Sequence, residues 1–122
     1  MLEKYTLHLQ RVVVKLLSKY RKGVMDEQVH LKRLADIAID LFGMTACIAR
    51  TSRSYSIGLK NADHEVMLTK AFCHEAKERI EKNLKDLKLE TCDNNDDTLE
   101  NIADTVFKNH GYAAAHPLER NW

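Results

Sequence analysis

Apolar residues recur at steps of three and four positions along most of the chain, a spacing that gathers them on one side of an α-helix. Only four glycines and one proline stand among the 122 residues, too few for the turns of a many-stranded β fold. The periodic stretches cover about residues 2–22, 24–54, 62–89 and 97–109. The sequence therefore predicts an all-α fold: a bundle of about four helices with short links and an extended C-terminal tail from Tyr112.

Length and composition fit one domain. A chain of this size with 44% apolar residues can bury one hydrophobic core, so we expect a single helical domain over 1–122. The three cysteines, Cys47, Cys73 and Cys92, are too sparse for a disulfide scaffold and favour a reducing compartment. The most apolar stretch, residues 34–49, contains two aspartates and is too short to cross a bilayer.

Several helix details follow from local patterns. Gly23 is expected to end the first helix, and Asn61 or Asp63 to cap the third. Asp97 with Glu100 resembles a capping box for the fourth. The second helix is apolar nearly all round, which is typical of a central helix or one covered by a partner. One of its apolar stripes consists of Leu31, Leu34, Ala35, Ala38, Phe42, Thr45 and Ala49.

Charge is divided unevenly between the two halves. Residues 1–60 hold eleven Lys and Arg against five Asp and Glu, whereas residues 61–122 hold eight against thirteen. The halves either complement each other within the fold, or the basic half faces an anionic partner. In the first helix the basic residues gather opposite the apolar stripe, as in a helix lying on an anionic membrane or an acidic partner, although ordinary bundle helices are amphipathic too. The candidate surface consists of Lys4, Arg11, Lys15, Lys19 and Lys22, with His8 beside them.

No pattern of residues indicates a catalytic, cofactor or metal site. The histidines lack the H-x-x-x-H and H-E-x-x-H spacings, and neither glycine-rich phosphate loop is present. Asp36 and Asp40 lie one turn apart and could share acid–base work or bind a metal, but the favoured alternative is that they pair with cations of a neighbouring helix or face solvent. The near-neutral charge and lack of aromatic platforms argue against nucleic-acid binding.

The longest distinctive pattern covers residues 23–76. Within it stand GMTA at 43–46, RTSRS at 50–54 and IGLKNADHEV at 57–66, and AHPLER follows at 115–120. This stretch resembles the C-terminal domain of the very-long-chain acyl-CoA dehydrogenase branch, and within that branch it is closer to acyl-CoA dehydrogenase family member nine. The similarity is looser in the first helix and poor over 77–109.

The resemblance implies a fragment of a larger mitochondrial flavoprotein on the matrix side of the inner membrane, working as a homodimer. Its N-terminal part would bind FAD and acyl-CoA for fatty-acid β-oxidation, and member nine also assists complex I assembly. No flavin or substrate residue of the family maps onto this chain. We therefore expect a non-catalytic domain for membrane association, partner contact or interdomain contact. The alternatives are a purely structural packing domain and an independent flavin- or acyl-CoA-binding module.

Overall fold

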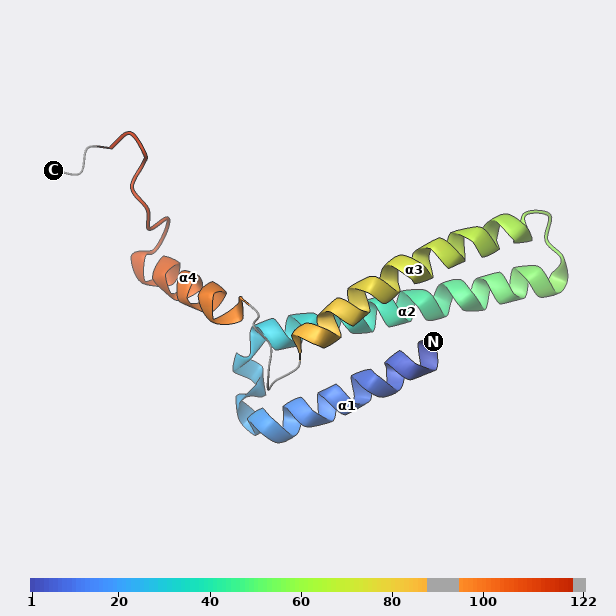
Figure 1. The fold of residues 1–122 in the computed structure, drawn as a ribbon, viewed down its shortest axis with the longest axis horizontal. Helices are drawn as coiled ribbons and strands as arrows, with labels where there is room; N and C mark the ends of the chain where they lie inside the picture. The colour runs from blue at the N-terminus through green and yellow to red at the C-terminus, as the bar shows by residue number, and fades with distance from the viewer. Residues whose placement is uncertain (88–94, 120–122) are drawn as a thin grey trace. The chain divides into compact units, whose positions relative to one another are not determined.

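Helices make up the fold of this computed structural model, which describes residues 1–87 and 95–119 (Figure 1). No strand occurs in these two ranges, and the prediction of an all-α fold is confirmed. Contacts divide the chain into two units, Met1–Cys92 and Asp93–Trp122. The prediction of a single domain over 1–122 stays a prediction. The elements in chain order are α1 (Leu2–Tyr20), the 3-10 helix η1 (Arg21–Asp26), α2 (Gln28–Ile57), α3 (Ala62–Asp86) and α4 (Asp96–Asn109).

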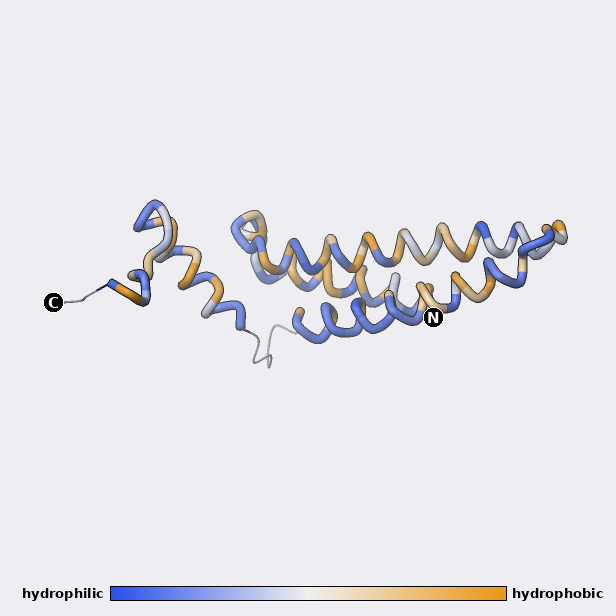
Figure 2. Tube along the Cα trace, turned by 90° about the horizontal axis from the view of Figure 1, so that it is seen from above, coloured by the Kyte–Doolittle hydropathy of each residue, from blue (hydrophilic) through white to orange (hydrophobic). Residues whose placement is uncertain are grey.

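In the first unit, α1, α2 and α3 enclose one hydrophobic core. The long helices α2 and α3 lie side by side and antiparallel, and apolar residues recur along all three helices (Figures 1 and 2). Full burial of one large apolar side chain contributes about 1.5–3 kcal/mol, so these few positions hold the helices together. The largest fully buried side chains are Leu16, Ile37, Met44 and Ile80.

The buried face of α2 does not coincide with the apolar stripe that runs from Leu31 to Ala49. Ala35, Ala38, Phe42 and Ala49 from that stripe are exposed, whereas the core receives Ile37, Leu41 and Met44, with Asp40 among them. Because α2 is apolar on several faces, its own periodicity does not distinguish the buried side. In α3 one side is buried from its middle to its end, and it consists of Cys73, Ala76, Ile80, Leu84 and Leu87.

The end of α1 differs from the prediction that Gly23 terminates it. The helix ends at Tyr20, and Arg21 adopts a left-handed conformation with φ +47° while its N–H still bonds the Leu17 carbonyl. Gly23 lies inside η1, the tight turn that redirects the chain toward α2. An arginine in left-handed space is unusual for a residue with a Cβ.

Gly58 ends α2 in the way expected of a glycine. Its φ is +68°, a conformation that costs glycine nothing, and the N–H of Leu59 bonds back to the Ser54 carbonyl at 3.1 Å. Asn61 then stands at the N-cap of α3, but its side chain makes no capping hydrogen bond. The backbone of this short link, with Ala62 N–H bonding the Leu59 carbonyl, closes the α2–α3 hairpin.

Gly43 marks a close approach of α2 and α3. A Cβ built on Gly43 would lie 2.9 Å from Cζ of Phe72. We expect Gly43→Leu to lower the free energy of unfolding by about 1–3 kcal/mol, because the added side chain overpacks this crossing. Denaturant titration followed by circular dichroism measures the change. Ala46→Leu on the exposed side of α2 is the control, and an equal loss in both variants would contradict a specific crossing.

The second unit consists of α4 and a tail that is not helical over 111–119. Asn95, and not Asp97, precedes the helix, so the predicted capping box is wrong and Asp97 lies in the first turn, where the helix dipole favours acidic residues. His110, with φ +54°, ends α4 one residue before Gly111. Three apolar residues of α4 are half exposed or more: Leu99 at 50%, Ile102 at 54% and Phe107 at 73%.

Candidate functional surfaces

The basic face predicted for the first helix is present at the surface of the first unit. All five predicted cations are exposed, and four of them stand on α1; Lys22 lies beyond it in η1. Lys4 and Lys19 lie over the rings of the tyrosines that follow them, with Nζ 5.8 Å and 5.2 Å from the ring centroids of Tyr5 and Tyr20. These contacts stay within α1 and leave the cations at the surface. We call the set Lys4, Arg11, Lys15, Lys19 and Lys22 the basic face.

Apolar side chains stand in the same exposed region of α1. Leu7 is 46% exposed and Val14 57% exposed. They precede and follow Arg11 by four and three positions, so the three side chains share one side of the helix. Leu17 is also exposed by half. The sequence predicted the cations but not this apolar component, because Leu7 and Val14 lie on the same side of the helix as the cations and away from the buried residues Tyr5 and Leu16.

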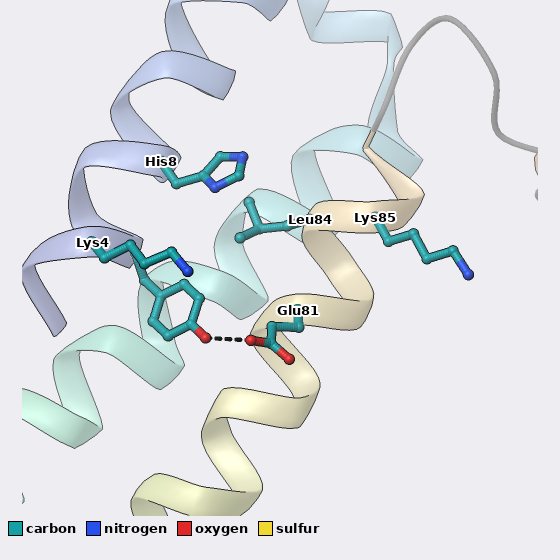
Figure 3. Close-up of a pocket in the computed structure, with 6 residues that line it drawn as sticks. Lys4, His8, Glu81, Leu84 and Lys85 are labelled. Atoms are coloured by element: carbon teal, nitrogen blue, oxygen red, sulfur yellow. Dashed lines mark hydrogen bonds between the residues drawn. The ribbon is translucent and has the colours of Figure 1, made fainter. Parts of the chain in front are cut away.

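A shallow groove separates one end of the basic face from α3. It has a volume of about 230 Å³ and is lined by Lys4, Tyr5 and His8 from α1 and by Glu81, Leu84 and Lys85 from α3 (Figure 3). The hydroxyl of Tyr5 donates a hydrogen bond to Oε1 of Glu81 at 2.5 Å. Burial, together with the neighbouring carboxylate, raises the pKa of Tyr5 to about 12. This bond ties α1 to α3 beneath Lys4.

The two aspartates of α2 are held by separate cations. Arg79 of α3 contacts Asp40 through Nε and Nη2, with the shortest distance 2.7 Å, and the hydrogen bond to Asp40 raises the pKa of Arg79. Asp36 pairs with Lys32 on its own helix at 3.1 Å. The favoured pairing across helices is thus confirmed for Asp40. A bidentate arginine–carboxylate pair holds two helices together. It also occupies the carboxylate oxygens of Asp40 that acid–base chemistry would need.

The outer face of α3 carries acidic side chains that contact cations and a tyrosine. Glu75 and Arg79 approach to 4.0 Å, but Glu81 contacts Lys77 and Tyr5. Near the start of α3, hydrogen bonds from Ser54 and Arg50 lower the pKa of Glu65. All these contacts connect helices or support one helix.

A second exposed surface consists of apolar residues on α2. Ile39 is 68% exposed and Phe42 is 77% exposed, and the small residues Ala35, Ala38, Ala46 and Ala49 around them are exposed as well. These positions follow one another at steps of three and four, so they share the side of α2 opposite to the core. We call this set the α2 apolar face. Single exposed apolar residues are ordinary, but a contiguous set is typical of an interaction surface.

The described part of the chain has neither a metal-binding cluster nor a membrane-spanning helix. Residues 1–87 and 95–119 contain no group of three or more His, Cys, Asp and Glu side chains that could hold a metal ion. Within the same ranges, no helix combines the length and the apolar character that crossing a bilayer requires.

The first unit is thus a small helical fold with a basic face on α1 and an apolar face on α2. The chain belongs to the family described as ACAD9/ACADV, C-terminal domain, whose sequence profile matches residues 1–112. It is 38% identical over 110 residues to the mitochondrial very long-chain specific acyl-CoA dehydrogenase of Mus musculus, a match covering 88% of this chain. It is 47% identical over 73 residues, or 60% of this chain, to the Homo sapiens protein of the same name. The matched regions are 16% and 11% of those relatives.

The family match confirms the predicted membership of the very-long-chain branch. The preference for family member nine within that branch stays a prediction.

Proposed function

We propose that this chain is the non-catalytic C-terminal domain of a mitochondrial, FAD-dependent acyl-CoA dehydrogenase, and that it attaches the enzyme to an anionic membrane through α1. The names of the relatives support the parent enzyme and its compartment. The flavin and the acyl-CoA belong to the remainder of the parent, a homodimer at the matrix side of the inner membrane. The parent protein acts in fatty-acid β-oxidation, in the assembly of complex I, or in both.

The observation that carries membrane attachment is the exposed mixture of cations and apolar groups on α1. Each Lys or Arg near an anionic bilayer surface contributes about 1 kcal/mol of attraction, so the basic face supplies several. Leu7 and Val14, both about half exposed, can enter the boundary between headgroups and acyl chains beside Arg11. A helix of this kind lies in the membrane surface and does not span it.

We expect the chain to float with vesicles that contain cardiolipin at low salt and to leave them at high salt, because the attraction is screened. The triple variant Arg11→Glu, Lys19→Glu, Lys22→Glu should reduce the partition coefficient at least 100-fold, as about 3 kcal/mol of attraction is lost. Flotation at fixed protein and increasing lipid concentration measures the coefficient.

The matched control carries the same charge change away from α1: Lys60→Glu, Lys70→Glu, Lys82→Glu, at three exposed positions. It should keep most of the binding. Equal losses in the two triple variants would show that net charge, and not the basic face, governs attachment. Binding that ignores salt, or no binding, would also reject the proposal.

The α2 apolar face supports a second function, contact with the dehydrogenase part of the parent protein. Phe42 and Ile39 form part of a contiguous exposed apolar surface, which is typical of a surface that another part of a protein covers. The chain spans only 16% of the length of a full relative, so such a part exists in that relative. Hydroxyl-radical footprinting should show Phe42 protected in the full-length protein relative to the isolated chain. Tyr55, at 67% exposure near the end of α2, is the reference position. Equal labelling of Phe42 in both forms would exclude this contact.

A further inference from the structure

The antiparallel pairing of α2 and α3 brings two cysteines face to face. The pairing is marked by the hydroxyls of Thr51 and Thr69, which hydrogen-bond at 2.5 Å. One helical turn back along α2 from Thr51 is Cys47, and one turn forward along α3 from Thr69 is Cys73. Because both steps of four residues run in the same direction in space, Cys47 and Cys73 occupy the next layer of the same interface.

The threonine layer shows how closely side chains of α2 and α3 approach each other one turn away from the cysteines. The Oγ1 atom of threonine and the Sγ atom of cysteine both follow Cβ, and a disulfide bond is about 2.05 Å long. Oγ1 of Thr51 and Oγ1 of Thr69 are 2.5 Å apart, and this distance exceeds the length of a disulfide bond by only about 0.5 Å. The helices approach closely here because Gly43 lies against Phe72 and Ala76 is fully buried.

The two thiols differ in their access to solvent. Both are free, Cys73 is 8% exposed and Cys47 is partly exposed. Burial, and to a lesser extent the nearby Cys47, raises the pKa of Cys73. A small oxidant therefore reaches the thiol of Cys47 first, and the buried thiol of Cys73 is the one that resolves the oxidised Cys47.

We propose that Cys47 and Cys73 form a reversible dithiol–disulfide pair that responds to hydrogen peroxide by cross-linking α2 to α3. The Cys47 thiolate attacks one peroxide oxygen, the O–O bond breaks, and water leaves after protonation, so Cys47 becomes a sulfenic acid. The sulfur of Cys73 then attacks the Cys47 sulfur, the S–O bond breaks, and the Cys73 proton leaves with the hydroxyl as a second water. Two thiols and one peroxide give one disulfide and two waters.

The test uses the full chain with Cys92→Ser, so that only these two cysteines remain. After treatment with hydrogen peroxide, intact mass spectrometry should show a loss of two hydrogens, and peptide mapping should place the link between Cys47 and Cys73. The melting temperature should rise by roughly 5–10 °C, because the cross-link restricts the unfolded chain, and dithiothreitol should reverse both changes.

A matched variant moves one thiol off the interface while it keeps one cysteine on each helix. In Cys73→Ser, Lys70→Cys the second thiol stands at an exposed position of α3. It should form no internal disulfide and show no reversible rise in melting temperature. Separate sulfinic acids on Cys47 and Cys73, thiols that persist under peroxide, or an equally efficient internal link in the displaced variant would each overturn the proposal.

Discussion

Replacing Ile80 with alanine should lower the free energy of unfolding by about 3 kcal/mol, the largest effect we expect from one core substitution. Ile80 has no exposed surface and lies in the cluster that joins all three helices of the first unit. Truncation removes buried methyl and methylene groups and leaves a cavity that neighbours fill only in part. A small domain is stable by only about 5–15 kcal/mol, so this change is a large share of the total.

Urea denaturation followed by ellipticity at 222 nm measures this loss. Ile39→Ala on α2 is the control with the same chemical change, because Ile39 is 68% exposed and should lose less than about 0.5 kcal/mol. Equal losses at positions 80 and 39 would mean that the core does not lie where the structure places it.

Replacing Arg79 with methionine should cost about 2–3 kcal/mol, more than replacing its partner. The side chain of Asp40 is only 12% exposed, so without Arg79 a nearly buried carboxylate remains unpaired. Asp40→Asn should cost about 1 kcal/mol, because Arg79 is 47% exposed and can turn to water. The asymmetry follows from which partner has access to solvent.

A double-mutant cycle tests this interpretation. Combining Arg79→Met with Asp40→Leu removes both charges, and much of the loss from Arg79→Met should be recovered. Thermal and urea unfolding at neutral pH give the four free energies. Additive losses would contradict a direct clamp between Asp40 and Arg79, and so would a greater cost for Asp40→Asn than for Arg79→Met.

Much of the fold could be predicted from the sequence because local rules operate within one helix. The core stripe of α3, from Cys73 to Leu87, follows from a single clear periodicity on an otherwise charged helix. The α1 cations are exposed because they all lie on one side of the helix and a charged side chain is costly to bury. The end of α1 could not be predicted, since the left-handed conformation belongs to Arg21 and not to the nearby glycine that favours it.

The sequence alone determined the basic face of α1 and the all-helical class, because helical periodicity depends on residues that are near one another along the chain. The tertiary structure decided which side of α2 is buried. Asp40 belongs to the inner side, and Phe42, although apolar, to the outer one. An evenly apolar helix has several sides that could be buried, and only the complementary surface of α3, with Arg79 positioned for Asp40, selects among them. The placement of Cys47 and Cys73 in one layer of the α2–α3 interface likewise follows from the pairing of the two helices.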